Sequence, residues 1–202
     1  LATWCAARGR GFLRLDYSGH GASGGRFVDG CIGDWAADAE AVIRHATTGP
    51  LVLVGSSMGG WISLLLATRL ADRLHALVGI AAAPDFTEDL MWAQFPPEIR
   101  DEIERTGQWK RPSQYGDAYP ITRRLIEDGR HHLVLRAPLP ITAPVRLLHG
   151  QRDPDVPWQL SLRTAETIAG DDVRVILVKD GDHRLSREQD LDLLARTVEE
   201  VL

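Results

Sequence analysis

The order of hydrophobic and polar segments along the chain predicts the fold class. Residues 51–54 and 77–82 are uninterrupted apolar runs, as expected for strands that are covered on both faces. Further strands are predicted at 11–17, 145–148 and 173–178, and helices at 32–45, 58–70, 159–168 and 187–201. Strands that alternate with helices indicate a mostly parallel sheet flanked by helices, so we expect an α/β fold.

The regular pattern breaks off between residues 84 and 144. This stretch contains six prolines and several aromatic residues, which predicts an inserted segment of short helices and loops. We therefore expect a core made of residues 1–84 and 138–202, with a lid or cap at 85–137. Four apolar side chains in the lid offer either an acyl-binding site or a plain lid interior: Met91, Trp92, Phe95 and Trp109.

Composition and charge narrow the class of protein. The chain has 202 residues, of which 44% are hydrophobic and 25% charged, as in an ordinary globular domain. A net charge of −5 argues against nucleic acid as a partner, because binding it needs a basic face. Cys5 and Cys31 are too few for a disulfide framework. No apolar run approaches the length that is needed to span a membrane, and residues 61–67, with Ser63 among them, are only seven residues long.

The strongest chemical signal is the pentapeptide Gly55-Ser56-Ser57-Met58-Gly59. It matches G-x-S-x-G, and it lies between a predicted buried strand and a predicted helix, as a nucleophile elbow does. Such a turn places the Ser57 hydroxyl at the carboxyl end of the strand. It also directs the backbone N–H of Met58 towards a developing oxyanion.

A serine nucleophile needs a base and an acid that orients the base, and in this arrangement they follow in the order nucleophile, acid, base. Asp153 follows the strand at 145–148, and His183 follows the strand at 173–178. Both are therefore expected on loops at the carboxyl ends of strands, where open α/β sheets bind ligands. Asp155 and Asp85 remain alternative candidates for the acid.

Two other chemistries find little support. Gly19-x-Gly21-x-x-Gly24 follows a predicted strand and matches a dinucleotide fingerprint, but the loop continues to Gly30 before a helix begins. Cys5, Cys31 and the pair His131-His132 do not form any ligand pattern of a metal site. We expect neither a metal nor a cofactor.

Several motifs together resemble the α/β-hydrolases: Asp16-Tyr17-Ser18-Gly19-His20-Gly21, Gly55-Ser56-Ser57-Met58-Gly59, His149-Gly150 with Asp153, and Asp182-His183. The segment Ala83-Pro84-Asp85-Phe86 through Met91-Trp92 resembles the start of the lid in one branch of that family. This branch holds the mitochondrial acyl-protein thioesterase and mycophenolic acid acyl-glucuronide esterase and their bacterial relatives.

The resemblance implies a serine hydrolase that cleaves carboxylic esters or thioesters, with Ser57, Asp153 and His183 as the triad and no cofactor. It implies a small-molecule or acyl-protein substrate. No targeting segment is visible, which favours a cytoplasmic location over a mitochondrial one. An epoxide hydrolase would need a carboxylate in place of Ser57. The rival interpretation is an inactive fragment or a non-catalytic binding module.

The resemblance also implies strands that this chain does not show. Members of the family carry three further strands before residue 11, and the third lies between the strands at 11–17 and 51–54. The loop after that third strand supplies a second oxyanion donor. We therefore expect an N-terminally truncated α/β-hydrolase fold, with poor solubility or poorly cooperative melting for this chain alone.

Overall fold

A computed structural model describes residues 1–112 and 118–202 of the protein. The contacts between residues divide the chain into two compact units. The first unit comprises residues 1–15, 43–84 and 134–202, and the second comprises residues 16–42 and 85–133. Helix α2 (Ile32–Ala46) runs from the second unit into the first.

A parallel sheet of four strands forms the first unit, in the order β1-β2-β5-β6. The strands are β1 (Leu51–Ser56), β2 (Leu74–Ile80), β5 (Val145–Gly150) and β6 (Val173–Val178). Every residue of β5 is buried, as expected for a strand with neighbours on both sides and helices on both faces. Its one charged residue, Arg146, forms ion pairs with Asp172 and Glu200.

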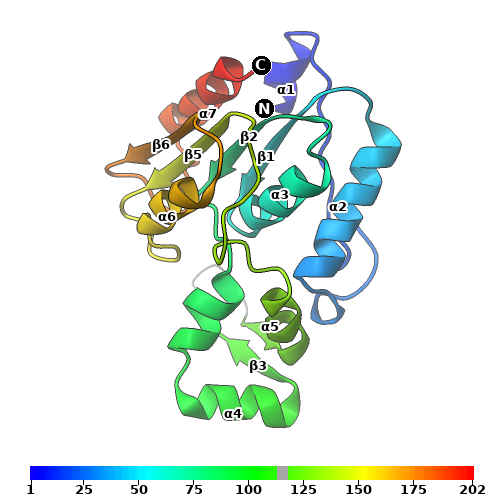
Figure 1. The fold of residues 1–202 in the computed structure, drawn as a ribbon. Coiled ribbons are helices and arrows are strands. Elements are labelled where there is room, and N and C mark those ends of the chain that lie inside the picture. Colours follow the sequence, from blue (N-terminus) through cyan, green and yellow to red (C-terminus); the bar gives the residue numbers. More distant parts are fainter. Residues whose placement is uncertain (113–117) are drawn as a thin grey trace. The chain divides into compact units, whose positions relative to one another are not determined.

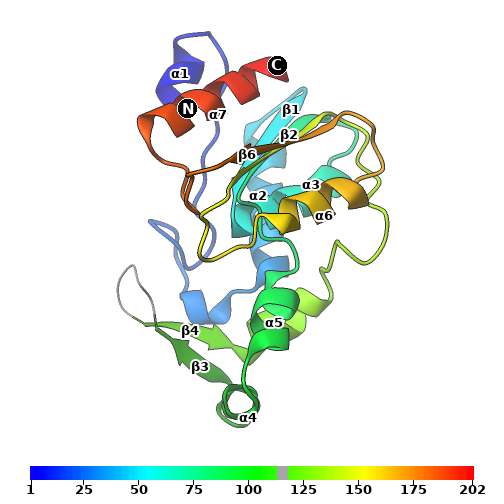
Figure 2. The same cartoon turned by 90° about the vertical axis from the view of Figure 1, so that its left-hand side faces the viewer.

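Helices cover both faces of this sheet (Figure 1, Figure 2). They are α1 (Ala2–Ala6), α3 (Met58–Arg69), α6 (Gln159–Thr167) and α7 (Glu188–Glu200). Helices α3 and α6 lie on one face, and α1 and α7 lie on the other. Alternate residues of β2 point to the same face of the sheet. Three of them, Ala76, Val78 and Ile80, pack in a cluster with Val198 and Val201 near the end of the chain. Helix α3 is mostly apolar, and its residues 60–67 are all buried, as expected for a helix in the interior.

The second unit combines short helices with an antiparallel pair of strands. Its elements besides α2 are η1 (Phe27–Asp29), η2 (Thr87–Met91), η3 (Trp92–Gln94), α4 (Pro97–Thr106), β3 (Gln108–Arg111), β4 (Tyr119–Thr122) and α5 (Arg123–Arg130). Strands β3 and β4 pair antiparallel. A small hydrophobic core gathers Met91, Ile103, Ile121 and Ile126.

Three details of the predicted secondary structure were wrong. Residues 11–17 form no strand, because none of the described residues supplies them with a hydrogen-bonded neighbour. The strand predicted at 77–82 is β2 (Leu74–Ile80), which begins and ends earlier, and Ala81 turns away with a φ of 44°. The strand pair β3 and β4 lies where short helices and loops were predicted, and in β4 the strand signal was weakened by Pro120.

The cover expected on both faces of β1 is incomplete. Leu53 is buried, but Val54 on the opposite face is 38% exposed. Within the described residues β1 pairs only with β2, so it is an edge strand. None of the helices in the described residues is long and apolar enough to cross a membrane.

Candidate active site

Ser57 occupies the sharp turn between β1 and α3. Its φ of 52° and ψ of −119° lie in a region that residues with a side chain rarely adopt. The turn is held from both sides, because the Ser57 N–H donates to the Ile80 carbonyl (2.9 Å) and the Ser57 carbonyl accepts from the Ala83 N–H (3.1 Å). Backbone strain that surrounding hydrogen bonds hold in place is typical of a functional residue.

Two glycines allow this turn for steric reasons. A Cβ at Gly55 would collide with the carbonyl oxygen of Gly59 and with Ser63 Oγ. A Cβ at Gly60 would lie about 2.5 Å from the Cβ of Ala82. The strand, turn and helix can approach this closely only without these side chains. The Met58 N–H lies in the first turn of α3, where the helix itself does not use backbone donors.

The loops after β5 and β6 are joined by backbone hydrogen bonds. Gln151 N–H donates to the Val178 carbonyl (2.8 Å), and Arg152 N–H donates to the Gly181 carbonyl (2.9 Å). Their approach is so close that a Cβ at Gly150 would collide with the carbonyl oxygen of Gly181. These contacts set the positions of Asp153 on one loop and His183 on the other.

The structure brings Ser57, His183 and Asp153 into one hydrogen-bonded chain, although they lie far apart in the sequence. His183 Nε2 is 3.1 Å from Ser57 Oγ, and His183 Nδ1 is 2.7 Å from Asp153 Oδ2. The Asp153 side chain is fully buried, whereas that of His183 is 18% exposed. An imidazole with a carboxylate on Nδ1 and a hydroxyl on Nε2 is oriented to take the hydroxyl proton.

Within this hydrogen-bonded chain, Asp153 and His183 shift each other's pKa towards the charged forms. Burial alone raises the pKa of Asp153, but hydrogen bonds from His149, from His183 and from two backbone N–H groups outweigh it and hold that pKa well below its usual range. The hydrogen bond to Asp153 raises the pKa of His183, against the effect of burial, and the charges of Asp155 and Asp182 add to the rise. Asp153 is therefore a carboxylate that stabilises a proton on His183.

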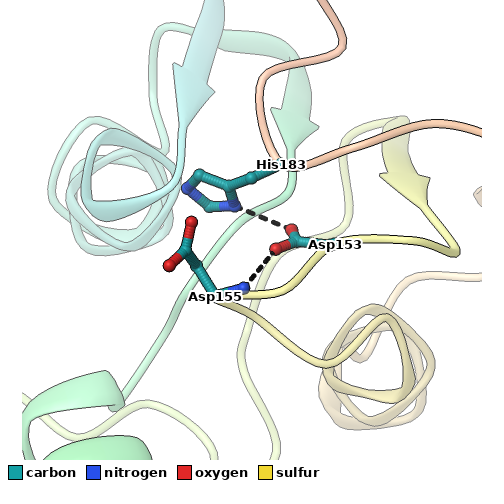
Figure 3. Close-up of side chains that lie close together, drawn as sticks. All are labelled: Asp153, Asp155 and His183. Carbon is teal, nitrogen blue, oxygen red and sulfur yellow. Dashed lines mark hydrogen bonds and ion pairs between the residues drawn. The ribbon is translucent and has the colours of Figure 1, made fainter. Parts of the chain in front are cut away.

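Asp155, the nearest alternative acid, lies beside the same imidazole. Figure 3 shows its carboxylate directed towards the His183 ring, while its backbone N–H donates to Asp153 Oδ1 (2.8 Å). The carboxylate that hydrogen-bonds to His183 Nδ1 is that of Asp153. Asp155 is exposed, so its charge is screened by solvent more than that of Asp153.

These three side chains are also a possible ligand set for a cation, which the sequence spacing did not indicate. One ligand atom each from Asp153, Asp155 and His183 lie within 4.8 Å of one another. However, Asp153 Oδ1 accepts two backbone N–H groups, and Oδ2 accepts from two imidazoles. Since a carboxylate has about four acceptor positions, a metal would have to displace one of these donors.

The other predicted residues belong to the second unit. Asp85 is fully buried, and its φ of 59° is unusual for a residue with a side chain. Met91 is part of the core of the second unit, and Trp92, Phe95 and Trp109 pack against that core. Phe95 and Trp109 meet edge to face, with ring centroids 5.4 Å apart. Met91, Trp92, Phe95 and Trp109 therefore all contribute to packing within the second unit.

The sequence motifs contained His149 and Asp182, but they did not predict how these residues contact the Asp153 and His183 loops. Fully buried His149 places Nε2 3.2 Å from Asp153 Oδ2 and Nδ1 2.7 Å from Ser161 Oγ. Asp182 Oδ1 accepts the N–H groups of Arg184 and Leu185, both at 3.0 Å, and so shapes the loop that carries His183. The sequence signals for His149 were its place in the His149-Gly150 motif and its polarity at the end of a mostly apolar strand.

Comparison with known proteins identifies the family. A sequence model of the alpha/beta hydrolase family matches residues 6–197. The mouse protein named palmitoyl-protein thioesterase ABHD10, mitochondrial, is 41% identical over 201 residues, which cover 98% of this chain and 67% of that protein. The human protein of that name is 37% identical over 204 residues, which cover 100% of this chain and 66% of that protein. The chain thus spans about two thirds of the length of these relatives.

Solved structures agree with the sequence comparison. A protein from Agrobacterium vitis S4 superposes with a TM-score of 0.96 at 42% identity, covering 99% of this chain and 79% of that one. Mouse alpha/beta hydrolase domain-containing protein 10 superposes with a TM-score of 0.90 at 40% identity, covering 98% of this chain and 80% of that one. A family model that matches nearly the whole chain and two structures of such similarity lead to one conclusion: this protein belongs to the alpha/beta hydrolase family.

Proposed function

We propose that this protein is a serine hydrolase that cleaves acyl thioesters and carboxylic esters through an acyl-enzyme. The observation that carries the proposal is the hydrogen-bonded chain from Ser57 Oγ through His183 to the buried carboxylate of Asp153. The strained turn at Ser57 adds support, because it presents the hydroxyl at the carboxyl end of β1, where open α/β sheets bind ligands.

The reaction follows from the placement of the protons. Ser57 Oγ bonds to the carbonyl carbon of the substrate while His183 Nε2 takes the hydroxyl proton. The Met58 N–H stabilises the oxyanion that forms. His183 then gives the proton to the departing sulfur or oxygen, and the carbon–sulfur or carbon–oxygen bond breaks. Water, deprotonated by the same imidazole, attacks the acyl-enzyme and releases the carboxylic acid together with free Ser57.

We infer the substrate class from the names of the relatives. The mouse and human proteins of the comparison are named palmitoyl-protein thioesterases, so we infer an S-acyl substrate on a protein or a small molecule. A thiol is a better leaving group than an alcohol, so the triad needs no additional acid to expel it. The relatives are also named mitochondrial, whereas the cytoplasmic location expected from the sequence stays a prediction.

The test compares two neighbouring serines. Ser57→Ala removes the attacking oxygen, so we expect hydrolysis of a palmitoylated cysteine peptide and of a p-nitrophenyl ester to fall to background. Ser56→Ala changes the last residue of β1, which is exposed and forms no part of the hydrogen-bonded chain, so most activity remains. A fluorophosphonate probe should label the wild type and Ser56→Ala at Ser57, and it should leave Ser57→Ala unlabelled. Unlabelled wild-type protein would contradict the proposal.

The lid residues offer a second, finer test. If Trp92 and Trp109 contact the acyl chain, Ala substitutions raise KM for a palmitoyl substrate much more than for an acetyl substrate. Ile103→Ala is the matched control, because Ile103 is fully buried in the same core. An equal rise in KM for both substrates, with the same loss of stability as in the control, would assign these aromatics to packing alone.

A further inference from the structure

The carboxylate of Asp153 is surrounded by four donors. Oδ1 accepts the N–H groups of Asp155 (2.8 Å) and Val156 (2.9 Å). Oδ2 accepts from His183 Nδ1 (2.7 Å) and lies 3.2 Å from His149 Nε2. Three of these donors belong to the loops after β5 and β6, whereas His149 comes from within β5 itself. A carboxylate has about four acceptor positions, so each is used.

The surroundings of His149 determine which nitrogen holds its proton. Nε2 faces only acceptors, namely the ionised Asp153 carboxylate and the Val156 carbonyl at 3.1 Å, so Nε2 must be the donor. Nδ1 is 2.7 Å from Ser161 Oγ, whose hydroxyl can donate to it and complete a neutral imidazole. His149 and Ser161 are both almost completely buried, so no water competes for these bonds.

We propose that His149, held by Ser161, is a positioning residue that acts on His183 through Asp153. Its hydrogen bond occupies the same carboxylate oxygen that binds His183, and so limits how strongly Asp153 can retain a proton on the general base. The inference rests on the proposed function only in giving His183 the part of a base, because the contacts themselves are present in the structure. The side-chain hydrogen bonds of His149 go to Ser161, Asp153 and Val156, and none of them goes to Ser57.

The charges around His183 make such a restraint useful. Three carboxylates favour the protonated form of this imidazole: Asp153 through its hydrogen bond and its charge, and Asp155 and Asp182 through their charges. A donor that draws on Asp153 Oδ2 weakens the strongest of the three interactions, because two donors share the charge of one oxygen. Without His149, the carboxylate would still be held by two backbone N–H groups and by His183, so it stays in place and binds the imidazolium more strongly.

The test measures the titration of His183 by NMR in the complete chain, which needs no turnover. His149→Phe keeps a planar ring but removes the donor, and we expect the titration midpoint of His183 to rise by about 0.5 to 1 pH unit. Hydrolysis of a p-nitrophenyl ester should then fall about three- to tenfold at pH 6 while remaining near wild type at pH 9. Ser161→Ala, which retains the ring but loosens it, should change both quantities in the same direction by less.

Two controls separate this role from packing. His149→Gln keeps an N–H donor and should restore the wild-type midpoint. Thr164→Val removes a buried hydroxyl one turn further along α6, where Thr164 Oγ1 donates to the Leu160 carbonyl (2.7 Å), and should change neither quantity. A merely structural role loosens the loops, so the midpoint would fall towards that of an exposed imidazole and activity would drop at every pH.

An unchanged or lowered midpoint in both His149→Phe and Ser161→Ala would overturn the proposal. If His149→Phe does not fold, the comparison of Ser161→Ala with Thr164→Val decides the question alone. The titration of His183 is independent of the proposed function. If every variant, including Ser57→Ala, kept its hydrolytic activity, the hydrolase mechanism would be refuted. The titration midpoint of His183 would still test the role of His149.

Discussion

Replacing the acid of the hydrogen-bonded chain by its amide, Asp153→Asn, changes one oxygen into an NH₂ group. Four donors face the native carboxylate, so the amide nitrogen must face two of them in either orientation. On the Oδ1 side the amide nitrogen would face two backbone N–H groups, which can only donate. Each donor left unsatisfied would cost about 1–3 kcal/mol.

On the Oδ2 side the amide nitrogen faces two imidazoles, which are able to adapt. His183 can shift its proton from Nδ1 to Nε2 and accept from the amide, and His149 can direct Nε2–H to the Val156 carbonyl alone. We therefore expect the amide to adopt this orientation. His183 Nε2 then carries a proton and can no longer take one from Ser57.

The structure thus predicts a large kinetic loss with little loss of stability. In the best-studied Ser-His-Asp triad the same exchange lowers kcat about 10⁴-fold, which corresponds to about 5.4 kcal/mol of activation free energy. The assay is steady-state hydrolysis of a p-nitrophenyl ester, paired with urea unfolding to confirm that the fold persists. Asp155→Asn is the matched control, and we expect a loss below about tenfold because its carboxylate is exposed. Equal losses in the two variants would refute the reasoning.

Three further predictions concern the pH profile, the turn and the sheet. Since only neutral His183 can take a proton, and hydrogen bonding to Asp153 raises its pKa above the ordinary 6.5, the acid limb of kcat/KM should lie above pH 6.5; Asp155→Asn should move it to lower pH, and a move to higher pH would contradict this sign. Gly55→Ala should abolish activity and lower the melting temperature in calorimetry, because its Cβ meets the backbone of α3. Leu53→Ala should lower the free energy of unfolding by about 2–5 kcal/mol in urea titration, whereas the partly exposed Val54 should tolerate Thr within about 1 kcal/mol.

The local sequence determined the α/β class and the sharp turn at Ser57. Strand, Gly55-Ser56-Ser57-Met58-Gly59 and helix follow one another within twenty residues, so a steric argument about neighbouring atoms was sufficient. The order of strands and helices also indicated a mostly parallel sheet with helices on both faces, and the structure and the family comparison confirm that prediction. Such features depend on periodicity and turn chemistry, which act over a few residues.

Contacts between distant segments decided the rest. Residues 11–17 have the alternation of a strand but find no partner among the described residues, because a strand is stable only when another strand completes its hydrogen bonds. Asp153 and Asp155 both lie in the segment that follows β5 in the sequence. Only the approach of the β6 loop shows which carboxylate is buried against His183. The contacts of His149 with Ser161, Asp153 and Val156 follow from no spacing in the sequence, so they became visible only in the folded chain.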